Sequence, residues 1–573
     1  MNKLRIMNLP TAYNRFMIRF CGVHAVILGF FGLAACGGAR PPVPPAKSPL
    51  PHERLNPIVE RYWDEHISPE TAASPQVLAD SLAVERRYLD EIATLPRQPL
   101  DPASRLTYDI FERRRELAVE GFSYPAELLA PDPFAGLPMQ LARAAADLRR
   151  APLARVADYD DWLRRIDEYD LWTKRAISNM RDGLRRGYSS PRAVVERALP
   201  VLQRLGEDSS ASVFYLPLRS MPDAIKDPDR TRLIAELSRS VKAKLLPDYR
   251  QLHDFLQHEY LPRARLNLAL STLPLGEAWY RHLIRVEASS SLTPGDIHKI
   301  GLGEVDRLRA RLGTSNAVAI SAAGAPLSAY AELKIQALTA LPALFSSPPP
   351  ADFEIRAAEP FFQGAELPAY RPAGVDRRSA VLYVDSSASG QASAAPVASF
   401  LREAIPGRHY QSALQRAQVD LPRFRRFETD PAYAEGWALY AASLGEELGL
   451  YASDEAKSVA LLLELRCAAL LVVDTGLHAG GWTRQQSSDY IRTQLAADDA
   501  EANLLIDRIA AAPATALACT MGELKIQALR THARQALGDR FDIREFHSEV
   551  LKDGPMPLDI LETKISGWIG SRR

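Results

Sequence analysis

Two short stretches decide how this chain can be interpreted. The first is FLREAIPGRHYQ, from Phe400 to Gln411, and the second is YAEGWALY, from Tyr433 to Tyr440. Each holds a carboxylate in apolar surroundings, Glu403 in the first stretch and Glu435 in the second. Arginine stands on either side of the first carboxylate, as Arg402 and Arg408. These four charged residues are the starting point for the fold and the chemistry.

The chemistry of one class of metal site explains why these residue types matter. Zinc hydrolases of the HExxH type place two histidines on one helix face, and the glutamate after the first histidine is the general base for a zinc-bound water. In one large group of these zinc hydrolases, the third zinc ligand is a glutamate on a later helix. A ligand must offer a lone pair, so the imidazoles must be neutral and the carboxylate ionised.

Several stretches, taken in order, resemble the bacterial domain-of-unknown-function 885 family, whose members look like zinc peptidases of the glutamate-ligand type. The first family motif is close to HExxPGHH, and residues 402–409 read REAIPGRH; the second, EGWALY after an aromatic residue, is intact. Later matches are LVVDTGLH with GWT at 471–483, FDIR with FH at 541–547, and GPMPL at 554–558. The resemblance covers about residues 55–571 and implies a mainly α-helical, zinc-peptidase-like body.

The departures from the family pattern lie where the chemistry should be. Glu403 matches the general base, here a vestigial one, and Glu435 matches the third ligand. Arg402 and Arg408 occupy the histidine positions, and a guanidinium stays protonated, so it cannot ligate zinc. Two neighbouring buried carboxylates without a metal are costly. We therefore expect the two arginines to form an Arg–Glu network with them.

A further departure lies in a stretch similar to RYxxxPGQAxxYxxG that begins at Arg508, where the tyrosine that could stabilise an oxyanion is Cys519. Together the losses favour a non-catalytic relative that holds no metal and binds a peptide or another envelope component. The alternative is a working hydrolase with a relocated Zn²⁺ site built from His409, Glu403, Glu435 and His478, with Glu435, His409 and His478 as metal ligands. A third possibility is a structural envelope lipoprotein that uses the fold only as a scaffold. The residues expected to form the binding site are Glu435, His409, Arg402, Arg408, Tyr433, His478 and Arg508.

The N-terminus predicts export and lipid anchoring. Arg19 precedes an apolar run that ends in Leu33-Ala34-Ala35-Cys36, which resembles a bacterial lipobox. Residues 1–36 are therefore expected to be a lipoprotein signal peptide starting at Met1 or Met17, with Cys36 lipidated. Residue 37 is glycine and not aspartate, which predicts the outer membrane, facing the periplasm. Residues 37–54 are proline-rich and predict an extended tether, and residues 55–573 form the body.

Within the body, helix signals dominate. Helices are expected to open after the N-caps Thr293, Ser453 and Thr483, the last with Gln486 in a capping box. Strand signals are confined to 353–356 and 380–384, so a small sheet is expected before the motif helix.

Composition excludes one class of partner. Lys+Arg and Asp+Glu are 70 each, so the net charge is zero and no basic block favours nucleic acid. The expected partners are the membrane, through the lipid anchor, and a peptide or envelope ligand. Cys467 and Cys519 both lie in apolar helical stretches; the sequence leaves their pairing open, and two buried free thiols are the favoured interpretation.

Overall fold

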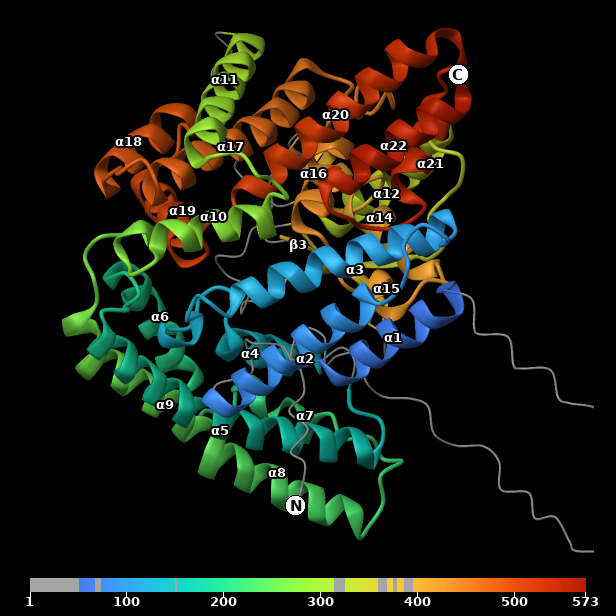
Figure 1. The fold of residues 1–573 in the computed structure, drawn as a ribbon. Helices are drawn as coiled ribbons and strands as arrows, with labels where there is room; N and C mark the ends of the chain where they lie inside the picture. Colours follow the sequence, from blue (N-terminus) through green and yellow to red (C-terminus); the bar gives the residue numbers. More distant parts are fainter. Residues whose placement is uncertain are drawn as a thin grey trace, which may run out of the picture.

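A computed structural model gives the fold (Figure 1). It describes residues 51–66, 74–149, 152–313, 325–358, 368–374, 379–385 and 395–573. The predicted signal peptide, the lipidation site Cys36 and the tether up to residue 50 lie outside the described residues. The described chain is mainly α-helical with one small sheet, as predicted. In the described residues, no helix combines the length and apolar character that crossing a membrane requires.

Three N-terminal helices start at strong sequence signals. The side chains of Ser74 and Asp101 cap α2 and α3, and a proline follows each cap in the first turn. Their buried aromatic residues, with those of α1, meet edge to face and join the main core. The first helix begins four residues before the predicted start of the body. The three helices are α1 (Pro51–Glu65), α2 (Pro75–Ala93) and α3 (Pro102–Gly121).

The next six helices surround an apolar core of their own, in the lower part of Figure 1. Stacked rings of Tyr169, Phe214 and Tyr249 lie at its centre. The longest helix, α5, ends at Gly187, whose φ of 82° is in the left-handed region that glycine favours. The six are α4 (Leu137–Asp147), α5 (Val156–Arg186), α6 (Arg192–Leu205), α7 (Leu216–Arg219), α8 (Asp229–Ser240) and α9 (Leu246–Phe255).

A three-stranded sheet follows α10 (Gly276–Glu287), α11 (Pro294–Leu312) and α12 (Leu327–Ala340). Its order is β1-β3-β2, with β1 parallel and β2 antiparallel to β3. All five residues of β3 are buried, which explains its continuous apolar run. The strands are β1 (Phe353–Ala357), β2 (Ala369–Arg371) and β3 (Ala380–Val384), of which β2 was not predicted.

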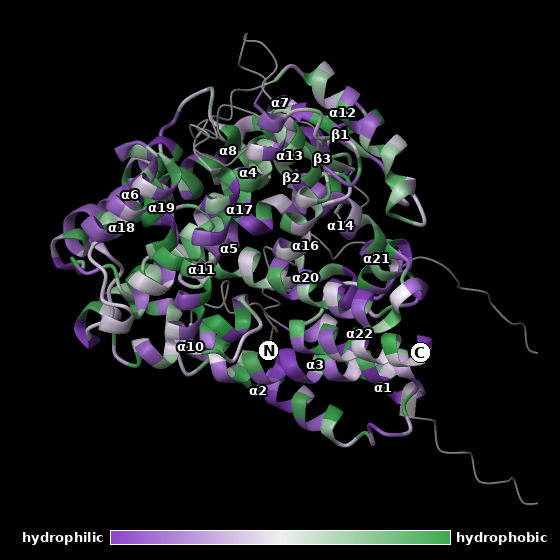
Figure 2. Cartoon of the chain, turned by 90° about the horizontal axis from the view of Figure 1, so that it is seen from above, coloured by the Kyte–Doolittle hydropathy of each residue, from purple (hydrophilic) through white to green (hydrophobic). Residues whose placement is uncertain are grey.

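The C-terminal helices complete the main core. Ser453 caps α17, and Thr483 with Gln486 forms the predicted capping box of α18. In Figure 2, most helices carry hydrophilic and hydrophobic residues together, as amphipathic helices do. The ten are α13 (Ala395–Glu403), α14 (Arg408–Ala417), α15 (Arg423–Phe427), α16 (Pro431–Ser443), α17 (Asp454–His478), α18 (Arg484–Leu495), α19 (Asp499–Ala511), α20 (Leu517–Leu537), α21 (Ile543–Leu551) and α22 (Leu558–Arg572).

Two glycines let α16 and α20 touch backbone to backbone. A Cβ atom on Gly522 would lie 1.8 Å from the carbonyl oxygen of Ala432, and one on Gly436 would lie 2.4 Å from the Cα of Gly522. Neither position therefore tolerates a side chain without moving a helix. Because Glu435 immediately precedes Gly436, this close approach also fixes the position of Glu435.

Candidate functional site

A tight turn over residues 404–407 joins α13 to α14 and sets the geometry of the site. A Cβ atom on Gly407 would lie 1.9 Å from the carbonyl oxygen of Arg402, so the turn requires glycine at this position. The indole Nε1 of Trp437 donates a hydrogen bond to the carbonyl oxygen of Pro406 at 2.9 Å. The turn is thereby attached to α16, the helix that carries the second motif.

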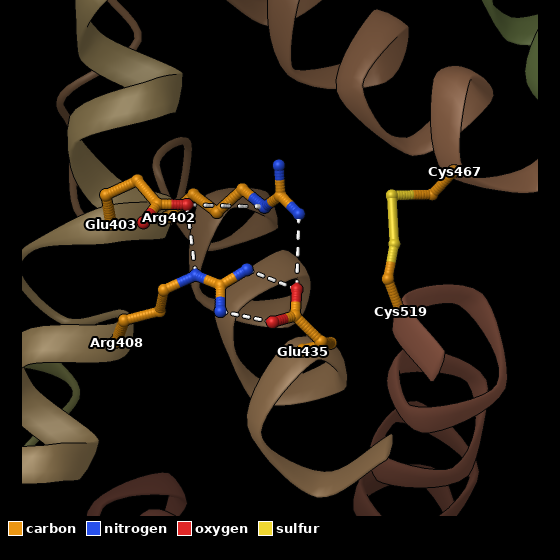
Figure 3. Close-up of a disulfide and its surroundings, with 6 residues drawn as sticks. All are labelled: Arg402, Glu403, Arg408, Glu435, Cys467 and Cys519. Atoms are coloured by element: carbon orange, nitrogen blue, oxygen red, sulfur yellow. Dashed lines mark hydrogen bonds and ion pairs between the residues drawn. A yellow bond between two sulfur atoms is a disulfide. The ribbon is translucent and has the colours of Figure 1, made fainter. Parts of the chain in front are cut away.

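The predicted Arg–Glu network lies beside this turn, with Arg402 and Glu403 at the end of α13, Arg408 at the start of α14 and Glu435 on α16 (Figure 3). The Nε of Arg408 donates to Glu403 at 3.0 Å, and its two terminal nitrogens donate to the two oxygens of Glu435. Arg402 lies 3.4 Å from Glu435 and 3.9 Å from Glu403. The backbone nitrogen of Tyr370 in β2 also donates to Glu403, at 3.2 Å. Both carboxylates therefore contact one guanidinium, and the two motif helices, α13 and α16, pack side by side.

The network is electrostatically balanced. Burial alone would lower the pKa of Arg408, but the charges of Glu403 and Glu435 outweigh burial and raise that pKa above its ordinary value. The side chains of Arg408, Glu403 and Glu435 are 24%, 11% and 29% exposed, so solvent screens them only in part. Two cations face two anions, and the arrangement needs no further charge.

These residues do not fit a zinc ion. A guanidinium has no lone pair to give a metal, and Arg402 and Arg408 occupy the positions where imidazoles would be needed. Both oxygens of Glu435 and one of Glu403 already accept hydrogen bonds from Arg408. A metal would have to displace the guanidinium between the two carboxylates.

His409 lies next to the network in sequence but points to other partners. Its Nε2 is 2.9 Å from the carbonyl oxygen of Ala351, and its Nδ1 is 3.2 Å from the hydroxyl of Tyr370. Burial lowers the pKa of His409 to about 4, so the ring is neutral at pH 7. Both ring nitrogens are engaged in hydrogen bonds, as in a structural histidine.

The other three predicted binding residues occupy separate places. The two ring nitrogens of His478 face the backbone NH of Leu270 at 3.0 Å and the carbonyl of Ile509 at 3.1 Å, and burial lowers its pKa to about 3. The hydroxyl of the buried Tyr433 donates to the carbonyl of Val550, and the guanidinium of Arg508 lies 5.0 Å from the ring centre of Phe134.

The alternative zinc site is therefore not assembled. Its histidines, His409 and His478, use their ring nitrogens on separate partners, and Glu435 is held by Arg408. Within the part of the chain that the structure describes, no three His, Cys, Asp or Glu side chains are arranged to hold a metal ion.

The interpretation of Cys467 and Cys519 as free thiols was wrong. The two form a disulfide that joins α17 to α20, with their Cα atoms 6.2 Å apart. Both are buried in apolar helices, as expected, but those helices are neighbours, and the Cα separation suits a disulfide. Figure 3 shows the disulfide beside the Arg–Glu network.

A pair of buried acids was missed from the sequence. Glu464 of α17 and Glu523 of α20 are both buried, about one turn from the disulfide along each helix. Burial and the charge of Glu464 raise the pKa of Glu523 well above its ordinary value, and Arg307 lies 3.6 Å from Glu464. The signal in the sequence is a single glutamate inside the apolar run of residues 459–473.

A cavity of about 1300 Å³ lies elsewhere on the molecule. Residues of α2, α3, α5 and α10 line it, and so do Asp430 and Pro431 at the start of α16. None of the four network residues is in its wall. Glu435 lies just over one turn beyond Asp430 on the same helix. The cavity and the network therefore both border α16 without sharing a residue.

Comparisons with known proteins agree with this fold. Residues 68–565 match a family model described as "Bacterial protein of unknown function (DUF885)". A crystal structure described as "the putative lipoprotein from Colwellia psychrerythraea" has a TM-score of 0.80 and 22% identity, covering 91% of this chain and 99% of that one. A "putative lipoprotein of unknown function from Shewanella oneidensis" has a TM-score of 0.64 and 14% identity, covering 89% and 96%. A search of curated proteins finds no match.

Proposed function

Because this chain belongs to the bacterial protein family of unknown function DUF885, whose motifs resemble a zinc-peptidase site, we propose that it is a non-catalytic member. In this proposal it is an exported lipoprotein that binds a peptide or another envelope component without cutting it. The observation that carries the proposal is the position of Arg408, whose guanidinium lies between Glu403 and Glu435. A positive charge belonging to the protein takes the place that a metal would need.

Two further features support the loss of chemistry. The vestigial general base, Glu403, accepts hydrogen bonds from Arg408 and from the backbone of Tyr370. Both oxygens of this carboxylate are thus engaged by the protein itself. The position of the expected oxyanion-stabilising tyrosine is Cys519, which is held in a disulfide and has no hydroxyl to donate.

Export and anchoring are part of the same proposal. Disulfides persist in oxidising compartments such as the bacterial periplasm, so the Cys467–Cys519 bond supports export. The structural neighbours are described as lipoproteins, which supports a lipoprotein, and residues 33–37 carry the finer proposal that Cys36 is lipidated at the outer membrane, facing the periplasm. Cys36→Ala should move the protein from the membrane fraction to the soluble fraction. If this variant still sediments with membranes, anchoring through Cys36 is wrong.

The central experiment measures zinc and peptide turnover in the purified mature chain after exposure to Zn²⁺ and dialysis. Wild type should hold no stoichiometric zinc and show no chelator-sensitive cleavage. Arg402→His with Arg408→His should gain zinc affinity, because two imidazoles and Glu435 then complete a ligand set. Glu435→Gln in that background should remove the gain. Each single reversion should do little, since one guanidinium remains beside the site.

One result would replace this proposal. If wild type binds one zinc ion tightly and cleaves peptides in a chelator-sensitive way, the chain is a working hydrolase, and its ligands must be sought outside the Arg–Glu network. Stoichiometric zinc that survives Glu435→Gln in wild type would point to the same conclusion.

A further inference from the structure

The cavity of about 1300 Å³ is larger than the 300–1,000 Å³ typical of sites for drug-sized molecules, so it has room for several residues of a peptide. Its walls are mostly apolar side chains, some from helices of the main core and some from the helices α4 and α5 of the second core. Aromatic side chains occur on several sides and offer faces to ligand groups. They are Tyr62, Phe122, Tyr124, Trp172 and Phe427.

The charges in the wall are unequal. Among the described lining residues there are seven carboxylates, four guanidiniums and no lysine. Each guanidinium is already held by a carboxylate of the protein, so the arginines are poorly placed to recruit an anion. The pairs are Arg113 with Asp559, Arg114 with Glu428, Arg115 with Glu85, and Arg285 with Glu120.

Three lining carboxylates, Glu127, Asp132 and Asp430, form no such ion pair with a described residue, and the buried Asp430 instead accepts hydrogen bonds from Ser289 and from the backbone nitrogen of Tyr433. Glu127 and Asp132 are half-buried, and neither forms an ion pair within 4 Å with a described residue. The side chain of Asp132 accepts a hydrogen bond from the backbone nitrogen of Phe134 at 2.7 Å, which orders the carboxylate without neutralising it. Burial raises the pKa of both carboxyl groups and outweighs the opposing charges of Arg186 near Glu127 and of Arg143 and Arg508 near Asp132.

We propose that this cavity binds a cationic peptide segment, whose ammonium or guanidinium groups pair with Glu127 and Asp132 while the apolar and aromatic walls receive the rest of the segment. Aromatic faces also attract cations, so the two kinds of wall favour the same ligand. An acidic segment would face three more carboxylates than guanidiniums. This inference rests on the proposed binding function and adds to it a site and a ligand class.

The test uses the full mature chain and three peptide amides of one length: Lys-Phe-Lys-Phe-Lys, Glu-Phe-Glu-Phe-Glu and Ser-Phe-Ser-Phe-Ser. Binding is followed by calorimetry and by tryptophan fluorescence, to which Trp172 in the wall contributes. The lysine peptide should bind at least tenfold more tightly than the other two, and its affinity should fall as salt is added. Trp172→Phe should remove most of the fluorescence change.

The variant Glu127→Gln with Asp132→Asn keeps the shapes and removes the charges. It should weaken the lysine peptide at least tenfold, whereas Glu332→Gln with Asp420→Asn, two exposed acids outside the cavity, should leave it unchanged. Circular dichroism and melting temperature check that both variants fold. Because the first variant leaves the Arg–Glu network intact, it does not affect the test of catalysis.

Three outcomes would overturn the inference: no binding of the lysine peptide, equal binding of all three peptides, or unchanged binding by the doubly neutralised variant. Each of these outcomes leaves the metal and turnover measurements standing. Conversely, metal-dependent cleavage by wild type would end the proposal of a non-catalytic protein, while selective binding of the lysine peptide would still support the cavity assignment.

Discussion

Removing the Arg408 guanidinium should destabilise the protein far more than removing an arginine from a surface ion pair. Arg408→Met keeps much of the aliphatic stem but deletes the group that contacts both carboxylates of the network. Glu403 and Glu435 would then face each other beside Arg402. Like charges in a partly buried site repel, and the guanidinium that contacts both carboxylates would be gone.

The magnitude follows from burial. Breaking a buried ion pair by removing one partner costs about 3–5 kcal/mol. Here the arginine is 24% exposed and Glu435 is 29% exposed, so solvent screens part of the cost. We therefore expect a loss near the lower end of that range, about 3 kcal/mol of unfolding free energy. Two effects contribute to this loss: the attraction between Arg408 and the carboxylates disappears, and the repulsion between Glu403 and Glu435 remains.

Urea unfolding followed by circular dichroism measures the difference, with Arg181→Met as the matched control. Arg181 makes a two-pronged pair with Glu259, but these side chains are 49% and 51% exposed. Its removal should cost less than about 1 kcal/mol. Adding Glu403→Gln and Glu435→Gln to Arg408→Met should recover most of the lost stability, because the repulsion is then gone.

Two results would refute this reasoning. If Arg408→Met is as stable as the Arg181→Met control, the network contributes no more than a surface pair. If the triple variant is no more stable than Arg408→Met alone, the cost comes from lost packing and not from uncompensated charge.

Two further predictions concern packing and pH. Gly522→Ala should lose about 2 kcal/mol or more of unfolding free energy in urea, because its Cβ would lie 1.8 Å from a carbonyl oxygen of α16. Gly567→Ala should gain about 0.5–1 kcal/mol in the same measurement, because no atom lies within 4 Å of its Cβ. Equal effects of the two substitutions would contradict the close helix contact. The pKa of His409 is about 4 when folded and about 6.5 when unfolded, so the unfolded state binds more protons between these values and stability falls as the pH drops from 6.5 towards 4. When the pH is lowered from 7 to 5, the unfolding free energy of His409→Gln should therefore fall by about 2 kcal/mol less than that of wild type. An equal fall in both proteins would show that the ring is not held neutral.

Much of the local structure could be predicted because its causes are local. The caps at Ser453 and Thr483 are formed by side chains within three residues of the backbone groups they satisfy. The short strand β2 was not predicted because three residues are too few to show the alternation of apolar and polar side chains that marks a strand. Its pairing with β3 also depends on the rest of the fold.

The Arg–Glu network could be predicted because the two matched motifs place Arg402, Glu403, Arg408 and Glu435 around one site. Two neighbouring carboxylates there need positive charge, and the arginines are the residues that supply it. The disulfide could not be predicted, because pairing depends on the distance between two helices that lie far apart in sequence. For the same reason the sequence could not place the cavity, whose walls come from helices spread along the chain from α1 to α22, or show that Glu127 and Asp132 form no ion pair there with a described residue.

The disulfide also bears on how this chain could evolve. A lineage that regained the expected tyrosine by Cys519→Tyr would break the crosslink and leave Cys467 as an unpaired thiol between packed helices. Losing such a bond typically costs about 2–4 kcal/mol. Under the proposed non-catalytic function, no catalytic gain would offset that cost until both arginines had also reverted. Selection for a folded protein alone would then preserve the disulfide and keep the lineage from returning.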